Sequence, residues 1–214
     1  MNYDYQKECY DANPHCKLHY SHGIPRIESN LYYLHYDEYL IIEYIRKGEV
    51  SKRIEGNIYT IAEGDLIITV PSELHVAIKT EEWYVERLSL HISESLLSAF
   101  GGDRTVFFDT IVGKKKGVGN LIVADVVKEY GMDILLNQCL EYAKEGTPEA
   151  QVLMNCKVIE LLSKLVNLAQ TSSPDDMVIP SSNKNVNEMI DYINRHYTED
   201  VTLDILAERF HFSK

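Results

Sequence analysis

Polar and aromatic side chains recur at alternate positions of two apolar segments, residues 31–46 and 83–92. Neighbouring side chains of a strand face opposite ways, so alternate residues are expected on one face. An aromatic surface combined with Arg, His and Glu suits a small polar ligand such as a sugar or a carboxylate. The residues in question are Tyr33, His35, Asp37 and Glu43 in the first segment and Trp83 and Arg87 in the second.

Simpler roles remain open for two of these residues. Arg87 could pair with Glu86 or Glu43 on the surface, and Trp83 could belong to the apolar rim of the fold. No Ser-His-Asp order, glycine-rich phosphate loop or Cys-His pair indicates catalysis. We therefore predict a binding protein and not an enzyme.

The 214-residue chain is 45% hydrophobic and 25% charged, as in globular proteins of one large or two small domains. Its apolar runs are far shorter than the roughly 20 residues that cross a bilayer, so no membrane contact is expected. Its N-terminus resembles no secretory signal, which predicts a cytoplasmic protein. The net charge of −12 should repel nucleic acid, whose binding depends on cationic neutralisation of phosphates. Four cysteines lack the spacing of a disulfide or zinc framework.

Short apolar segments separated by turns indicate β structure between residues 31 and 92. Gly56 and Asn57 suit a two-residue hairpin turn, because glycine accepts the positive φ that such turns require. Many short antiparallel strands in such a length are typical of a small barrel. The expected strands are residues 31–36, 39–46, 50–55, 57–61, 66–70, 74–79 and 84–92.

Beyond residue 93 the apolar spacing becomes helical. Ser93 is expected to cap a short helix over residues 94–100, and residues 121–143 and 148–170 predict a helical hairpin. The second helix of the hairpin carries more apolar residues than one buried face requires. Complete burial in the monomer and burial in a homodimer both account for this surplus, and we predict a homodimer.

The C-terminal residues resemble those of a family of DNA-binding proteins. Residues 190–197 and 201–213 are similar to the start of the DNA-binding region of AraC-type transcriptional regulators. In that resemblance Thr202 caps the first helix of a helix-turn-helix, and Ser213 and Lys214 open the recognition helix. The remaining DNA-binding helices would lie beyond Lys214, so DNA is an expected partner only of a full-length form.

The N-terminal part is similar to the cupin-type sensor barrel of the same regulators. Residues 64–75 match the second cupin motif closely, and residues 35–48 match the first less well. Together the resemblances cover nearly the whole chain and imply a regulator that responds to a small polar effector. The expected effector-binding residues are Tyr33, His35, Glu43, His75, Trp83 and Arg87.

The cupin resemblance also raises the question of a metal. Metal-dependent cupins use two His and one Glu from the first motif and one His from the second. His35 and His75 stand at His positions, whereas Asp37 replaces the second His and the expected Glu falls on Ile41 or Ile42. We therefore predict no metal or other cofactor. The residues that would hold a metal, if one were bound, are His35, Asp37, Glu43 and His75.

Several other residues are expected to have no special role. The lysines at 114–116 are expected to be solvated, and the segment before Leu31, rich in Tyr and His, is assigned to the barrel domain as an N-terminal arm. The remaining histidines are predicted to be structural or exposed; they are His15, His19, His22, His91, His196 and His211.

The sequence thus predicts an α+β fold: a small antiparallel cupin-type β-barrel, a helical hairpin and a partial helix-turn-helix. The expected divisions are a barrel domain with its arm (1–120), a dimerisation region (121–172), a linker (173–185) and the start of a DNA-binding domain (186–214). Two alternative functions remain open, a metal-dependent cupin enzyme and a ligand-free cupin dimerisation module.

Overall fold

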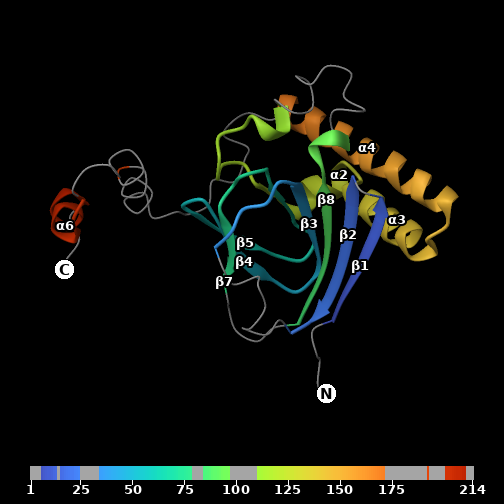
Figure 1. The fold of residues 1–214 in the computed structure, drawn as a ribbon, viewed down its shortest axis with the longest axis horizontal. Coiled ribbons are helices and arrows are strands. Elements are labelled where there is room, and N and C mark those ends of the chain that lie inside the picture. The colour runs from blue at the N-terminus through green and yellow to red at the C-terminus, as the bar shows by residue number, and fades with distance from the viewer. Residues whose placement is uncertain are drawn as a thin grey trace.

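The computed structural model describes residues 6–13, 15–24, 34–78, 84–96, 110–171, 192 and 201–210. In these ranges the chain forms two antiparallel β-sheets and a set of helices, an α+β fold (Figure 1). The larger sheet has six strands, in the order β1 (Gln6–Asn13), β2 (Cys16–Gly23), β8 (Val85–Ile92), β3 (Leu40–Lys47), β6 (Leu66–Thr69) and β9 (Leu121–Ile122). The smaller sheet has three, in the order β5 (Asn57–Ile61), β4 (Val50–Ile54) and β7 (His75–Ile78).

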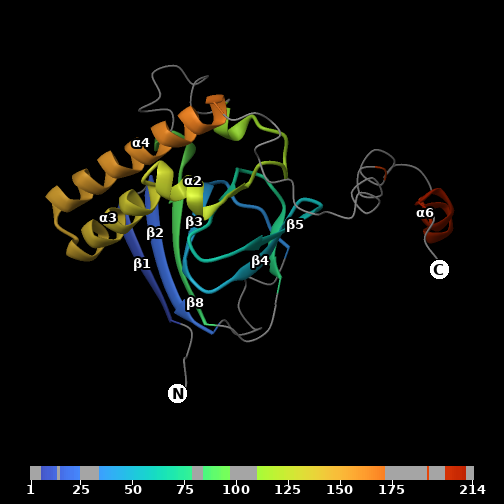
Figure 2. The same ribbon diagram turned by 180° about the vertical axis from the view of Figure 1, so that it is seen from behind.

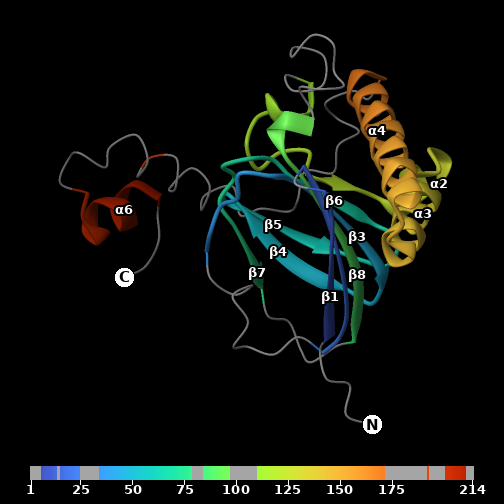
Figure 3. The ribbon, with the colours of Figure 1, turned by 45° about the vertical axis from the view of Figure 1, so that its right-hand side comes forward.

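The two sheets face each other in place of the single closed barrel that the sequence predicts (Figure 3). The expected strands between residues 39 and 92 are confirmed to within one residue at each described end. In the described ranges no ladder of hydrogen bonds joins the two sheets, and beyond β4 the partner of β7 is one isolated bridge between His35 and His75. The described part of the strand expected over residues 31–36 therefore forms only this isolated bridge.

The described part of the N-terminal segment, which the sequence assigns to the barrel domain as an arm, forms a hairpin of the larger sheet. β1 pairs with β2, and β2 pairs with β8 along its whole length, from Cys16 opposite Ile92 to Gly23 opposite Val85. Cys16 and Leu18 are fully buried, whereas most of the tyrosines and histidines near them are only partly buried. The polar residues concealed the strand, because only alternate side chains of β2 enter the core.

The helix predicted over residues 121–143 is wrong as a single element. Leu121 and Ile122 form β9 and pair with β6, after which α2 (Ala124–Glu129) and α3 (Met132–Glu145) are separate helices. Gly131 adopts a φ of 62° between them, a left-handed conformation that interrupts the helical path and favours glycine. The second predicted helix is confirmed as α4 (Pro148–Thr171).

α3 and α4 cover the outer face of the six-stranded sheet (Figure 2). Ile42 of β3 and Leu90 of β8 are register partners, and both are fully buried in the core under these helices. Leu161 of α4 is fully buried in the same core. Much of the apolar surplus of α4 is therefore used within the monomer, whereas Val152 and Cys156 of the predicted apolar stripe are exposed.

The last described element is α6 (Leu203–Phe210), which confirms the short helix expected after residue 201. Its predicted cap is also confirmed, because the Thr202 hydroxyl accepts a hydrogen bond from the Ile205 amide at 3.3 Å. The turn that should follow, with Ser213 and Lys214, lies outside the described residues, as does the expected linker over 173–185. No helix in the described ranges is both long and apolar enough to cross a bilayer.

Candidate functional site

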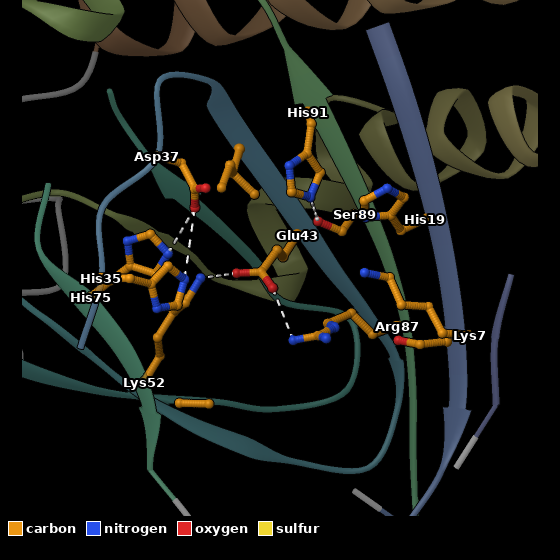
Figure 4. Close-up of a pocket in the computed structure, with 13 residues that line it drawn as sticks. Lys7, His19, His35, Asp37, Glu43, Lys52, His75, Arg87, Ser89 and His91 are labelled. Carbon is orange, nitrogen blue, oxygen red and sulfur yellow. Dashed lines mark hydrogen bonds and ion pairs between the residues drawn. The ribbon is translucent and has the colours of Figure 1, made fainter. Parts of the chain in front are cut away.

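A polar pocket lies between the inner faces of the two sheets (Figure 4). Its volume is about 80 Å³. Next to it the same inner faces are apolar, with Ile45, Ile54 and Tyr59 packed into a separate buried cluster. The lining residues are Lys7, His19, Ser21, His35, Asp37, Ile41, Glu43, Lys52, His75, Ala77, Arg87, Ser89 and His91.

The six-stranded sheet supplies three rows of side chains to the pocket. Strand register places Lys7 opposite Ser21, and Ser21 opposite Arg87. In the next row His19 is opposite Ser89, and Ser89 is opposite Glu43. In the third row His91 is opposite Ile41. Alternation along each strand keeps all three rows on the inner face, since the members that one strand contributes are two residues apart.

The three-stranded sheet and the segment before β3 supply the opposite wall. Lys52 of β4 lies across from Ala77 of β7, and His75 begins β7. Reciprocal backbone hydrogen bonds of 3.1 and 2.8 Å join His35 to His75. The Ser72 amide also donates to the carbonyl oxygen of Asp37 at 2.9 Å. These bonds hold His35, Asp37 and His75 together at one end of the pocket.

Glu43 is a buried carboxylate between two cations. It forms ion pairs with Lys52 and, at 3.0 Å, with Arg87. Burial alone would raise the pKa of Glu43, but the charges of Lys52 and Arg87 outweigh it and lower this pKa from 4.5 to about 2. The carboxylate is therefore ionised at neutral pH and links strands from both sheets across the pocket.

His75 is oriented by a backbone hydrogen bond. Its Nδ1 lies 2.9 Å from the Glu73 carbonyl oxygen, which can only accept, so Nδ1 carries the proton. Burial, and secondarily the charge of Lys52, lowers the pKa of His75 and favours the neutral ring. The lone pair on Nε2 then faces Asp37 Oδ2 at 3.3 Å, an approach of two acceptors.

This arrangement fits a metal ion better than the sequence indicates. His35, Asp37 and His75 each offer a ligand atom, and the three atoms lie within 4.8 Å of one another. Two His and one carboxylate is a known donor set for divalent transition metals, and a second ring nitrogen bonded to a backbone carbonyl is typical of ligating histidines. Glu43 does not join this set, because Lys52 and Arg87 hold its carboxylate.

Two histidines that were expected to be structural or exposed line the pocket. The rings of His19 and His91 are 4.5 Å apart, and His91 Nε2 lies 3.0 Å from the Ser89 hydroxyl. Burial, with the neighbouring His19, lowers the pKa of His91 to about 4. His91 was detectable from sequence, since it continues the alternation of Arg87 and Ser89, whereas His19 was missed together with its strand.

Lys52 was also missed, although the pattern of its strand contains the signal. Val50 and Ile54 point inward, so alternation places Lys52 on the inner face between them. A lysine in that position requires a buried carboxylate, and Glu43 is that group. Lys7 and Ser21 belong to the unrecognised N-terminal hairpin.

Of the expected effector-binding residues, the structure brings together His35, Glu43, His75 and Arg87. Arg87 pairs with Glu43, and the carboxylate of Glu86 accepts hydrogen bonds from Arg46 and Tyr20. Tyr33 and Trp83 lie outside the described residues, as do the expected DNA-binding residues Ser213 and Lys214.

A buried polar network lies directly behind the pocket. Glu73 is fully buried, and its carboxylate accepts hydrogen bonds from the amides of Val70 and Gly117, each at 2.8 Å, and from Asn120 Nδ2 at 2.9 Å. Asn120 is joined in turn to Ile68 of β6 by hydrogen bonds at 2.7 and 2.8 Å. The network connects the segment that carries His75 to the segment that enters β9 and α2.

The basic turn in front of this network is only partly exposed. Lys114, expected to be solvated, donates a hydrogen bond to the Gly119 carbonyl at 3.3 Å, and burial lowers its pKa to about 8. Lys116 donates to the Ser72 carbonyl at 2.8 Å. These lysines therefore help to hold the turn against the segment that leads to His75.

No family model and no curated protein matches this chain. Solved structures do resemble it. The AraC-like transcriptional activator CuxR has 10% sequence identity and a TM-score of 0.52, over 98% of this chain and 70% of that one. A conserved protein of unknown function from Streptococcus pyogenes (14% identity, TM-score 0.36) covers 44% of this chain and 77% of its own. A cupin 2 conserved barrel domain protein from Leptotrichia buccalis (12% identity, TM-score 0.36) covers 42% and 41%. At these identities a likeness concerns the fold alone, and of these three structures only CuxR has a TM-score above 0.5. The fold of this chain is therefore similar to that of an AraC-like activator.

Proposed function

We propose that this chain is the effector-sensing part of a cytoplasmic, ligand-responsive transcriptional regulator of the AraC type, and not an enzyme. The observation that carries the proposal is a charged pocket in a chain whose fold is like that of an AraC-like activator along 98% of its length. The effector is a small polar molecule, because the pocket of about 80 Å³ is lined mainly by charged and hydrogen-bonding side chains.

The mechanism of such a regulator is linkage between two sites. An effector that prefers one arrangement of the pocket shifts the protein toward that arrangement by its differential affinity. In this proposal a change in the pocket is transmitted to the helices by the hydrogen-bond network around Glu73. The network contacts both the segment that carries His75 and the residues that lead into α2. Movement of this segment would change how the helices, and any DNA-binding domain attached to them, are presented.

Specific DNA binding is the output that this proposal assigns to the regulator. Sequence is read by side chains of a helix seated in the major groove, whereas phosphate contacts only position the protein. The resemblance assigns that helix to residues from Ser213 onward, and the net charge of −12 gives the 214 residues little attraction for phosphates. In a gel-shift assay at low salt, these 214 residues should therefore bind duplex DNA only weakly.

A thermal-shift panel of sugars and small acids tests the sensing role. A molecule that binds only the folded state raises the melting temperature, and a concentration of about a hundred times Kd stabilises by about 2.7 kcal/mol. At least one small polar compound should stabilise the chain, and the effect should shrink in the Arg87→Gln variant. A panel without any stabilising compound would favour the ligand-free dimerisation module instead.

A metal-dependent function is the second candidate, and the cluster of His35, Asp37 and His75 favours it. A bound metal would supply a Lewis acid at one end of the pocket. Metal analysis of the purified protein decides between the candidates. A stoichiometric transition metal that is lost in both His35→Ala and His75→Ala would favour the metal protein, whereas binding of an effector by metal-free protein would favour the sensor.

A further inference from the structure

The charges of the pocket are unevenly distributed. Among the lining residues there are three cations, Lys7, Lys52 and Arg87, against two carboxylates, Asp37 and Glu43. Counted over the charged lining side chains that the structure describes, cations exceed carboxylates by one, in a chain whose net charge is −12. Glu43 is shared by Lys52 and Arg87, and Asp37 lies at the other end beside His75. Lys7 and Arg87 therefore mark a cationic end of the pocket, opposite the end that holds Asp37.

The cationic end is a row of donors across three strands. Lys7 of β1, Ser21 of β2 and Arg87 of β8 are consecutive register partners on the inner face of the larger sheet. Ammonium, hydroxyl and guanidinium groups in one row favour an anionic group such as a carboxylate. Lys7 is exposed at the edge of the sheet, so an anion can approach this end from solvent.

The opposite end presents acceptors. Nδ1 of His75 donates to the Glu73 carbonyl, which leaves Nε2 as an acceptor directed at Asp37 Oδ2. Figure 4 shows His35, Asp37 and His75 on one side of Glu43, with Lys7 and Arg87 on the other. A ligand that reaches from one end to the other therefore needs an anionic group at one end and hydrogen-bond donors at the other.

The volume of the pocket limits the size of that ligand. One water-sized group occupies about 10–15 Å³ in this measure. The pocket of about 80 Å³ therefore holds a molecule of about five to eight non-hydrogen atoms. A second anionic group would lie against Asp37, so one carboxylate is favoured over two.

We propose that the pocket binds a small hydroxy acid, with its carboxylate at Lys7 and Arg87 and its hydroxyl groups at Asp37 and His75. The inference rests on the proposed function, since it names the chemical class of the effector. It is independent of whether binding activates or represses a regulator, and it assigns each end of the ligand to named residues.

Three probe molecules distinguish the contribution of the carboxylate to binding from that of the hydroxyl groups. Glycerate has a carboxylate and hydroxyl groups, glycerol lacks the carboxylate, and propionate lacks the hydroxyl groups. In calorimetric titrations of the 214-residue chain at neutral pH, glycerate should bind at least about tenfold more tightly than either of the other two probes. Asp37→Asn should reduce the preference for glycerate over propionate, because the hydroxyl groups lose a charged acceptor.

Substitutions at the cationic end test the position of the carboxylate. Arg87→Gln should weaken glycerate binding by about tenfold and leave glycerol binding unchanged. Lys7→Gln should weaken it in the same direction, and its exposed position excludes a folding defect as the cause. Arg53→Gln is the matched control, because Arg53 neighbours Lys52 on β4 but is exposed on the opposite face, and it should have no effect.

Three results would overturn the inference. The first is that glycerol or propionate binds as tightly as glycerate. The second is that the Arg87→Gln and Lys7→Gln variants bind glycerate as tightly as the Arg53→Gln control does. Failure of all the probes to bind also overturns it. If a neutral sugar then stabilises the chain in the wider panel, the sensor proposal stands without the acid, whereas a panel without any ligand removes both.

Discussion

At the scale of single residues, Glu43 determines the electrostatics of the pocket. Its carboxylate is the shared partner of Lys52 and Arg87, and all three side chains are largely withdrawn from water. Such a group stabilises less by its own attraction than by preventing two buried cations from being left uncompensated. Removing Glu43 should therefore destabilise the fold by more than the net contribution of its two ion pairs to stability.

Replacing this carboxylate should be costly. Glu43→Gln leaves Lys52 and Arg87 without a counter-charge, and the free energy of unfolding should fall by about 3–5 kcal/mol, as measured by urea denaturation. Glu160→Gln removes a carboxylate of similar size from an exposed pair with Lys157, so this control should change the value by less than about 1 kcal/mol. Equal effects of the two substitutions would show that Glu43 is not the buried counter-ion described above.

His91 should make stability depend on pH. Burial lowers its pKa from 6.5 to about 4, so between these values the unfolded chain binds a proton that the folded chain does not. The contribution of the neutral His91 ring to the free energy of unfolding is therefore complete above pH 6.5. As the pH falls toward 4 the free energy of unfolding should decrease by up to about 3 kcal/mol.

The measurement is urea denaturation at about pH 7.5 and about pH 5, on either side of the ordinary histidine pKa. His91→Gln should reduce the loss of stability between these pH values, and His75, whose pKa is also lowered, should account for part of what remains. His15→Gln, at an exposed histidine, is the control and should retain the full loss. An unchanged pH dependence in His91→Gln would contradict the assignment.

At the scale of elements, the short segment between β6 and β7 connects the pocket to the helices. Its Glu73 side chain reaches Gly117 and Asn120, and its backbone carbonyl accepts from His75. Asp65 makes a second connection, because its carboxylate accepts a hydrogen bond from the Ala124 amide at the start of α2, at 2.8 Å. Both carboxylates bind backbone amides, so each holds the path of a segment and not only a side chain.

Substitution of Glu73 should loosen the connection. Glu73→Gln turns one acceptor oxygen into a donor that faces other donors, and the buried mismatch should cost about 1–3 kcal/mol. The Gly117 amide bonds Oε1 of Glu73 and the Val70 amide bonds Oε2, so hydrogen exchange should increase at the one whose oxygen is replaced and change little in α4. The same exchange pattern in Glu73→Gln and wild type would show that the network does not hold these segments.

At the scale of the whole molecule, exposed apolar side chains on α4 are the basis for predicting self-association through this helix. Val152 is 62% exposed, and Cys156, one turn further along the helix, is exposed as well. The buried leucines of α4 cannot serve such an interface, because the sheet and α3 already cover them. A homodimer would therefore use the outer face of α4.

Light scattering at micromolar concentration should give twice the monomer mass, and Val152→Glu should give the monomer. The substitution should not affect folding, because Val152 is largely exposed. Ile134→Glu is the control, since Ile134 is exposed to a similar extent (59%) but belongs to α3. A monomeric wild-type chain would remove the dimer from the proposed function.

Local sequence signals were sufficient to predict the positions of most of the elements and which of their residues face inward. Alternation and turn residues located the strands from residue 39 to residue 92, and parity placed Glu43 and Arg87 on inner faces, because both signals depend only on neighbours along the chain. The same kind of signal located α4 and the Thr202 cap of α6. It failed at β1 and β2, where polar residues occupy the face that borders the pocket.

Which of these residues meet depends on the packing of the two sheets. Lys52 and Glu43 are partners because the sheets face each other, and no local pattern encodes the distance between strands of different sheets. The same packing assembled His35, Asp37 and His75 into one cluster. The packing of α4 on the outer face of the larger sheet placed Leu161 in the monomer core. Strand pairing within the larger sheet shortened the helix expected over 121–143, because pairing with β6 outweighed the helical pattern at its first two residues.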